Sequence, residues 1–387
     1  MDYDLLVIGA GIQGAAVAQA ACAAGYRTLV IEQYGEPGRG TSSRSSKLIH
    51  GGLRYLESAQ FRLVRECLIE RARLLVNAPH LVRLVPFHIP IYRQTTRRPW
   101  KITAGLALYS LFSRKPFHRL PRSRWDTLDG LNTRDLQAVF VYQDGQTDDA
   151  RLTRAVLASA QALGCEVWLE SRFDTARVTE HGCDVQVTRN GNPHNLTACA
   201  LINCAGPWAD QVAQRCEPKT AQPRIELVQG SHIELPGCLR QGMYYLEAPR
   251  DRRAVFVMPW HDRTLIGTTE QPYRGDPALV KPLETEIDYL LEVRNHYFSA
   301  PKRRSDVIDS FAGLRVLPTG SGSAFSRPRA TLVVADRRRR PRVLHVYGGK
   351  LTAYRSTADE LLDRLRATLP ARESVADTRT LKLPDVP

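Results

Sequence analysis

The sequence predicts an α/β protein that begins with two strands of a parallel sheet joined by a helix. Apolar runs at residues 4–8 and 26–31 predict the two strands. Between them, an alanine-rich helical stretch follows the turn Gly9-Ala-Gly11-Ile12-Gln13-Gly14. This order of elements, with the G-x-G-x-x-G spacing at the first turn, is typical of a βαβ unit in a doubly wound fold.

Each glycine of this turn meets a steric need. Gly9 lets the chain bend, Gly11 lets a pyrophosphate approach the backbone, and Gly14 lets the helix pack on the strand. The second strand ends at Glu32, where a carboxylate can accept hydrogen bonds from an adenosine ribose. Three glycines alone would fit a purely structural turn, but the complete unit predicts a dinucleotide site. The carboxylate favours FAD or NAD over NADP.

Composition limits the possible functions. The 387 residues are 43% hydrophobic, which is enough for a large core and predicts two domains. A formal charge of +14 favours anionic partners, and since no nucleic-acid-binding module is recognisable, these are anionic lipid or a phosphate-bearing substrate. The eight cysteines have neither Cys-x-x-Cys nor zinc-like spacing, so we expect no disulfide and no metal.

One segment is a candidate for membrane contact. No stretch has the roughly 20 apolar residues needed to cross a bilayer, and no signal peptide is expected, so we expect a cytoplasmic protein, peripheral on the inner face of the membrane. The segment from Ile102 to Phe112 is apolar and has basic residues on both sides. Such a segment fits a helix lying in the membrane interface, and it fits a buried helix equally well.

The remaining elements are predicted from periodicity. Helices are expected at about residues 61–78, from Leu152 to Leu163, and from Ala353 to Leu369. Strands are expected at residues 166–169, 198–203 and 342–347. The strand at 198–203 leads into Ala205-Gly206-Pro-Trp208, where small residues let the chain approach a ligand closely. Without a low-complexity linker, the two domains are expected to be interleaved.

Seven motifs resemble, in order, those of the FAD-dependent glycerol-3-phosphate dehydrogenases of the respiratory, quinone-linked type. The motifs are Thr41-Ser-Ser-Arg-Ser-Ser-Lys47-Leu-Ile-His50-Gly-Gly-Leu-Arg54-Tyr55-Leu, Asp148-Asp149-Ala-Arg151-Leu, Gly230-Ser231-His232, Val257-Met-Pro259-Trp260, Ile266-Gly267-Thr268-Thr269, Gly313-Leu314-Arg315-Val-Leu317-Pro318 and Gly348-Gly349-Lys350-Leu-Thr352-Ala353-Tyr354-Arg355. The match runs from residue 1 to about residue 360, and the block from Ser45 to Leu56 is specific to that family.

The resemblance implies a fold and a reaction. It implies a Rossmann-like FAD-binding domain of the glucose-oxidase or D-amino-acid-oxidase type (residues 1–78, 145–220 and 305–375), interleaved with an antiparallel-sheet substrate domain (79–144 and 221–304) and followed by a tail (376–387). It also implies oxidation of glycerol 3-phosphate to dihydroxyacetone phosphate by hydride transfer from C2 to FAD N5. Electrons would pass to a quinone or another acceptor, and FAD would be bound non-covalently.

The cofactor residues follow from these patterns and from the resemblance. The expected FAD-binding residues are Gly9, Gly11, Ile12, Gln13, Gly14, Glu32, Thr41, Ser42, Ser46, Lys47, Leu48, His50, Phe173, Ala205, Gly206, Trp208, Gly313, Lys350, Leu351 and Thr352.

The expected substrate-binding residues are Arg54, Tyr55, Thr269, Arg315, Arg329 and Lys350. A phosphate dianion needs several cations, and arginine supplies bidentate geometry while lysine supplies a compact charge. Arg329 is preferred to Arg327 for the phosphate because it directly precedes Ala330-Thr331.

The expected catalytic residues are His232, Arg315 and His50. An imidazole titrates near the working pH, so His232 or His50 could accept the hydroxyl proton of the substrate. A lone histidine is more often structural, and His50 could equally contact the flavin.

Two other functions fit the same fold. A flavin oxidase or dehydrogenase acting on an amino acid or another hydroxy acid would need one carboxylate-binding arginine rather than a cluster of cations. A non-catalytic protein stabilised by FAD would not need the set of residues named above. Many relatives continue into a C-terminal helical domain where this chain stops at Pro387, which leaves oligomeric state and membrane docking open.

Overall fold

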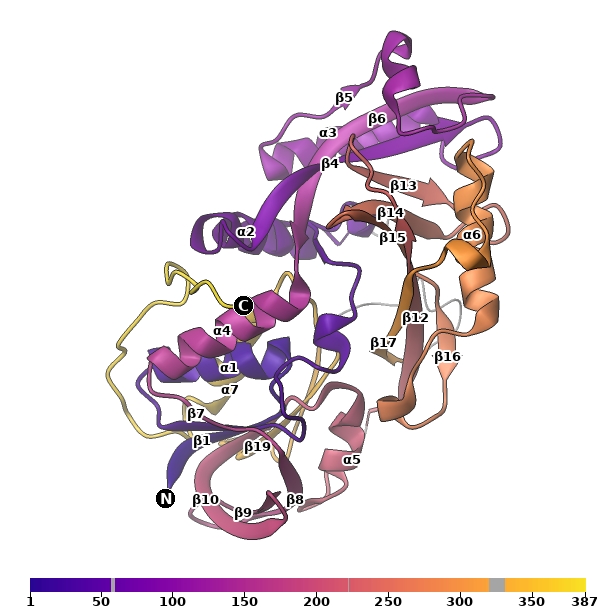
Figure 1. Ribbon diagram of the computed structural model, residues 1–387. Coiled ribbons are helices and arrows are strands. Elements are labelled where there is room, and N and C mark those ends of the chain that lie inside the picture. Colours follow the sequence, from indigo (N-terminus) through magenta and orange to yellow (C-terminus); the bar gives the residue numbers. More distant parts are fainter. Residues whose placement is uncertain (57–59, 222, 320–330) are drawn as a thin grey trace.

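The computed structural model describes residues 1–56, 60–221, 223–319 and 331–387, and for Arg54 it describes the backbone alone. The described chain forms two sheets. The sheet that contains β1 is in the lower part of Figure 1, and the sheet that contains β4 and β6 is in the upper part. Helices α1, α4 and α7 lie beside the first sheet, and helices α2, α3 and α6 lie beside the second.

The first sheet has a parallel centre. Its strands are β1 (Tyr3–Ile8), β2 (Thr28–Ile31), β7 (Glu166–Trp168), β8 (Ser171–Val178), β9 (Cys183–Arg189), β10 (Asn192–Asn203), β11 (Cys216–Glu217), β18 (Leu332–Ala335) and β19 (Val343–Tyr347). β1 pairs in parallel with β2 and β10, β2 with β7, and the end of β10 with β19. Strands β8 and β9 extend this sheet as an antiparallel ladder on the first half of β10. The predicted βαβ unit is confirmed at β1, α1 and β2.

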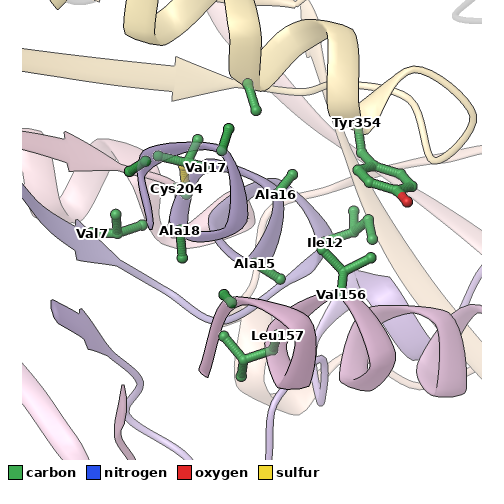
Figure 2. Packing of buried hydrophobic residues seen from close by; sticks show 14 of the residues in the cluster. Val7, Ile12, Ala15, Ala16, Val17, Ala18, Val156, Leu157, Cys204 and Tyr354 are labelled. Carbon is green, nitrogen blue, oxygen red and sulfur yellow. The ribbon is translucent and has the colours of Figure 1, made fainter. Parts of the chain in front are cut away.

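Three helices pack together against this sheet: α1 (Ile12–Ala23), α4 (Asp149–Ala162) and α7 (Tyr354–Leu365). Figure 2 shows α1 between α4, which contributes Val156 and Leu157, and the helix that begins at Tyr354. The small side chains of α1 allow this close approach on both sides, and every residue of the helix except Gln13 is buried. The pyrophosphate turn is therefore held rigidly by the core of the first sheet.

The second sheet is almost wholly antiparallel. Its strands are β3 (Leu48–Ile49), β4 (Val82–Tyr92), β5 (His118–Arg119), β6 (Leu136–Thr147), β12 (Ile225–Pro236), β13 (Met243–Glu247), β14 (Ala254–Trp260), β15 (Arg263–Gly267), β16 (Gln271–Tyr273) and β17 (Asp309–Pro318). The order is β16-β12-β15-β14-β13-β4-β6-β3, with β17 also paired to β12 and β5 to β6. The pairing of β13 with β4 is parallel.

The other helical elements connect or cover the sheets. They are α2 (Phe61–Asn77), α3 (Pro99–Ser113), α5 (Ala209–Ala213), α6 (Glu284–Tyr297) and the short 3₁₀ turns η1 (Thr41–Ser43), η2 (Leu53–Leu56), η3 (Arg122–Thr127), η4 (Gly206–Trp208), η5 (Pro277–Leu279) and η6 (Arg304–Asp306). The predicted helices at 61–78, 152–163 and 353–369 are confirmed as α2, α4 and α7. α4 begins three residues before the prediction because the Asp148 side chain caps it by accepting a hydrogen bond from the Arg151 N–H (3.0 Å).

Two strands lie in the second sheet although the proposed segments group them with the first domain. β3 pairs with β6, and β17 pairs with β12 along its whole length, from Asp309 opposite Glu234 to Pro318 opposite Ile225. The continuous β12–β17 ladder joins the segments on either side of residue 305. If the proposed domains follow the sheets, the boundary between residues 304 and 305 moves to about residue 318.

Helix α3 is neither fully buried nor able to span a membrane. In the described ranges, no helix has both the length and the apolar character needed for a transmembrane span. Leu106 and Tyr109 are buried, whereas Trp100 is 68% exposed and Leu111 is 74% exposed. Of the two alternatives, a fully buried helix is therefore excluded, since α3 carries exposed apolar side chains as well.

Candidate active site

One cavity of about 800 Å³ is lined by both sheets. Its wall includes the β1–α1 turn, the η1 loop, the end of β10 and residues of β12, β14 and β17. Many of the predicted site residues line it: Gly9, Gly11, Ile12, Gln13, Glu32, Thr41, Ser42, Ser46, Leu48, His50, Tyr55, Phe173, Ala205, Gly206, Trp208, His232, Gly313, Arg315, Lys350, Leu351 and Thr352. The fold thus brings residues from the whole length of the chain to one space.

The glycine turn has no room for side chains. Gly9 has a φ of +95°, and a Cβ atom there would lie 2.8 Å from the Cys204 carbonyl oxygen. A Cβ atom on Gly14 would lie 1.8 Å from the Gly9 carbonyl oxygen, which is inside van der Waals contact. Gly14 does not line the cavity itself, so its part is to let helix α1 approach the turn.

Glu32 closes this end of the cavity. Its carboxylate accepts hydrogen bonds from the Ala10 N–H (2.7 Å) and the Tyr34 N–H (3.0 Å). Burial raises the pKa of the Glu32 carboxyl, and these backbone donors act against that rise. The carboxylate is thereby fixed at the end of β2, in the position where a ribose hydroxyl would meet it.

The loop from Thr41 to Lys47 lies over the N-terminus of α1. Ser42 Oγ accepts a hydrogen bond from the Ile12 N–H (2.9 Å), and Thr41 Oγ1 donates one to the Leu314 carbonyl (2.7 Å). Lys47 is buried, and its ammonium pairs with Asp149 and donates to the Ser43 carbonyl. Lys47 is predicted at the cofactor; it does not line the cavity itself, but its ion-pair partner Asp149 does.

Gln13 indicates that the cavity is built for a polar ligand. Its Oε1 and Nε2 atoms are buried and have no hydrogen-bond partner among the described residues. A Cβ atom on Gly349 would lie 2.6 Å from Gln13 Nε2, so that glycine gives the amide its room. An unsatisfied buried polar group costs about 1–3 kcal/mol, which a bound ligand could recover. The turn, Glu32, Ser42 and Gln13 fit the pyrophosphate and ribose of FAD.

His232 lies in the wall of the same cavity. Its ring stacks on Phe311 with centroids 4.9 Å apart, and Nε2 lies 2.9 Å from Ser46 Oγ. Nδ1 is buried and has no partner among the described residues. Burial, together with the charges of Arg315 and Lys47, lowers the pKa of His232 to about 3. The imidazole is therefore neutral at physiological pH, as a proton acceptor must be.

A depressed histidine pKa predicts a loss of stability in mild acid. In the unfolded chain His232 takes up a proton near pH 6.5, whereas in the folded protein it resists protonation until about pH 3. The effect of His232 on the free energy of unfolding is constant above pH 6.5. Below that pH this free energy falls, by about 2 kcal/mol at pH 5. Thermal unfolding of wild type and His232→Asn between pH 7 and pH 5 should show a smaller decrease in the variant. Equal decreases would contradict the buried neutral state; the pKa of His345 is also lowered, to about 4, and should supply a residual decrease in both proteins.

Cationic and aromatic groups line the same cavity. Arg315 on β17 lies 2.9 Å from Glu270 Oε1 through Nη1 and donates to Thr268 Oγ1 through Nη2 (3.1 Å). Lys350 Nζ lies 4.9 Å from the centre of the Tyr55 ring. Two cations from distant parts of the chain therefore line the cavity that contains His232, which is an arrangement suited to a phosphate.

One predicted substrate residue, Thr269, does not line the cavity. The Thr269 hydroxyl contacts Glu286 Oε1 and accepts from the Ser231 N–H (2.8 Å), so it joins a buried network behind the wall. The neighbouring Thr268 lines the cavity in its stead. The side chain of Arg54 and the whole of Arg329, with its alternative Arg327, lie outside the described residues.

Several charged residues of the cavity wall were missed by sequence reasoning, and two of them, Arg253 and Glu270, form an ion pair with each other. Glu270 directly follows the Thr268-Thr269 motif, so its position was a usable signal. Arg253 belongs to a run of three arginines and an aspartate between residues 250 and 253, and nothing in that run distinguishes a cavity residue from a solvated one.

Comparison with known proteins identifies the family. The model of the family described as FAD dependent oxidoreductase matches residues 4–355. The chain belongs to this family. As an FAD dependent oxidoreductase it has the predicted α/β fold and the predicted cofactor, so both predictions are confirmed at the level of the family.

Relatives of this FAD dependent oxidoreductase include glycerol-3-phosphate dehydrogenases, as the resemblance predicted. The glycerol-3-phosphate dehydrogenase of Pseudomonas aeruginosa is 39% identical over 371 residues, covering 94% of this chain and 72% of the relative. The D-erythritol 1-phosphate dehydrogenase of Brucella abortus is 38% identical, covering 95% and 74%. The structure of the Bacillus halodurans glycerol-3-phosphate dehydrogenase complexed with FAD superposes with a TM-score of 0.77 at 25% identity, covering 99% of this chain and 68% of that chain.

Proposed function

We propose that the protein oxidises sn-glycerol 3-phosphate to dihydroxyacetone phosphate. The observation that carries the proposal is the presence of Arg315, Lys350 and a neutral His232 in the cavity of the dinucleotide turn. The similarity to glycerol-3-phosphate dehydrogenases supports the same substrate. A phosphate dianion needs more than one cation, whereas an amino acid or a simple hydroxy acid needs one arginine for its carboxylate.

The side chains of the cavity wall have different roles in the proposed reaction. Arg315 and Lys350 bind the phosphate and so orient the carbon that loses hydride. FAD, when bound, supplies the two-electron acceptor for that hydride. His232 accepts the proton of the C2 hydroxyl; its Nε2 lies 2.9 Å from Ser46 Oγ, and both side chains line the cavity.

Substrate preference tests this proposal. Initial rates with a soluble dye as electron acceptor are compared for glycerol 3-phosphate, erythritol 1-phosphate, glycerol and a set of amino acids. We expect rapid turnover only with the phosphorylated polyols. The Brucella abortus relative makes erythritol 1-phosphate the second candidate substrate, and the ratio of kcat/KM values decides between the two. Faster oxidation of an amino acid than of either phosphate would contradict the proposal.

We also propose that the protein is peripheral on the inner face of the cytoplasmic membrane and passes its electrons to a quinone there. Helix α3 supports this docking surface, because Trp100 and Leu111 are exposed on it. The basic residues Lys101, Arg114 and Lys115 flank this apolar surface and suit anionic headgroups.

Binding to anionic vesicles should depend on the basic end of α3. Each lysine or arginine near an anionic surface contributes about 1 kcal/mol, so the double variant Arg114→Gln, Lys115→Gln should bind roughly thirtyfold more weakly. Co-sedimentation with phosphatidylserine-containing vesicles measures this, and rising salt should weaken wild-type binding because screening limits charge interactions to about 8 Å. A matched variant, Arg338→Gln, Arg339→Gln, changes two exposed arginines of the β18–β19 turn and should bind as wild type. The proposed docking surface would be contradicted if wild type bound neutral and anionic vesicles equally well. It would also be contradicted if both double variants lost the same share of binding to anionic vesicles.

A further inference from the structure

Three charged side chains form a continuous bridge along the cavity wall. The Glu270 carboxylate lies between two guanidinium groups, 2.9 Å from Arg315 Nη1 on one side and 2.9 Å from Arg253 Nη2 on the other. Arg253 also donates through Nη1 to the Glu270 carbonyl (3.2 Å). The carboxylate is 3% exposed, so the bridge is built into the wall and is not a surface contact.

The bridge fixes the direction of the Arg315 side chain. Glu270 engages Nη1 and Thr268 engages Nη2, so both ends of the guanidinium fork have defined partners on the segment between β15 and β16. A flexible arginine would lose conformational freedom each time it bound a substrate. An arginine already held by its neighbours binds an anion in one geometry, which favours reaction as well as affinity.

Arg253 compensates the negative charge that Glu270 brings to the cavity wall. Glu270 alone would cancel the charge of Arg315 at the place where a dianion must bind. With Arg253 included, the three groups together carry one net positive charge. All three line the cavity, and Arg253 Nε is buried without a hydrogen-bond partner among the described residues. The second guanidinium therefore keeps the wall positive while the carboxylate holds the first in place.

We propose that Glu270 is a positioning residue for Arg315, and that Arg253 is the counter-cation through which the bridge sets the preference for phosphorylated over unphosphorylated substrates. This inference rests on the proposed function and adds two residues to it. Positioning and net charge are separable properties. Glu270→Gln keeps the shape and raises the positive charge but removes the negative charge that anchors Arg315, whereas Arg253→Met keeps that anchor and removes one positive charge.

The test uses the FAD-loaded protein and two readouts. The first is the ratio of kcat/KM for glycerol 3-phosphate to that for glycerol. The second is the dissociation constant of inorganic phosphate, followed by the change in the flavin spectrum. The matched control is Arg263→Met, because Arg263 forms a similar 2.9 Å ion pair with Glu234 in the same sheet but does not line the cavity. Arg253→Lys keeps a cation without the fork and serves as the conservative variant if Arg253→Met loses FAD.

Arg253→Met and Glu270→Gln should change the two readouts differently. We expect Arg253→Met to reduce the preference ratio roughly tenfold or more and to weaken phosphate binding by a similar factor, and Arg253→Lys to recover part of both. Glu270→Gln should lower kcat/KM for glycerol 3-phosphate while inorganic phosphate binds at least as tightly as in wild type. Arg263→Met should match wild type in both readouts.

Two results would overturn the inference, and they are distinguishable. If wild type prefers glycerol 3-phosphate to glycerol and the Arg253 and Glu270 variants retain that preference with FAD bound, the bridge has no role in recognition. If wild type itself shows no preference for the phosphorylated substrate, the proposed function fails and the inference fails with it.

Discussion

A Gly14→Val protein should be purified almost without FAD. The added Cβ atom would lie 1.8 Å from the Gly9 carbonyl oxygen, and two further methyl groups would point into the packed space between α1 and the turn. Forcing such atoms into a close-packed site costs about 1–3 kcal/mol, and more where backbone must shift. Here the backbone that must shift is the turn at Gly9 and Gly11, which is the part that fits the pyrophosphate.

Flavin content measures this effect. Protein is precipitated with acid, and the flavin released into the supernatant is quantified against the protein; colour remaining in the pellet would contradict the non-covalent attachment that we propose. Gly35→Ala is the matched control, because Gly35 does not line the cavity and a Cβ atom there would make only ordinary van der Waals contact, 3.5 Å from Glu170 Oε1. That variant should keep its FAD. A Gly14→Val protein with a full complement of FAD would contradict the steric account.

Arg315→Ala should keep FAD but lose most activity toward glycerol 3-phosphate. Charge-assisted hydrogen bonds contribute about 1.5–3 kcal/mol each, so the loss of a bidentate contact should cost several kcal/mol of transition-state stabilisation. The substitution also leaves Glu270 paired with Arg253 alone, so these groups lose their net positive charge. Both effects act on the phosphorylated substrate.

Unphosphorylated glycerol is the internal control for this variant. It cannot use the phosphate contacts, so its slow turnover should change little, and the preference for glycerol 3-phosphate should collapse. Steady-state kinetics with both substrates and one dye acceptor measures the preference. An Arg315→Ala protein that kept FAD and its full preference would remove Arg315 from the substrate site and favour the oxidase acting on a carboxylate substrate.

The nucleotide-binding part of the fold could be predicted because its determinants are local. Gly9, Gly14 and Glu32 are separated by fixed short distances within one βαβ unit, and each has a steric or hydrogen-bonding reason that can be stated from sequence. The same holds for helices α2 and α4, in which apolar residues recur at helical spacing.

The substrate side was predicted less completely because its partners are distant in sequence. Lys47 belongs to a motif beside the cofactor, yet the buried carboxylate of Asp149, about a hundred residues later, takes its charge. Thr269 and Thr268 are adjacent in sequence and face opposite sides of the wall, which a motif does not distinguish. Arg253, which directly precedes β14, becomes recognisable only when the fold places it and Arg315 of β17 on either side of Glu270.

The visible spectrum of the purified protein, recorded anaerobically before and after addition of glycerol 3-phosphate, tests the central claim most directly. The claim is that FAD and a phosphorylated polyol meet in the cavity lined by Arg315, Lys350 and His232. Bound oxidised flavin absorbs visible light, and transfer of two electrons from the substrate bleaches that band. We predict rapid bleaching by glycerol 3-phosphate and none by glycerol at the same concentration and time. A flavin band that persists with glycerol 3-phosphate but is bleached by an amino acid would contradict the account.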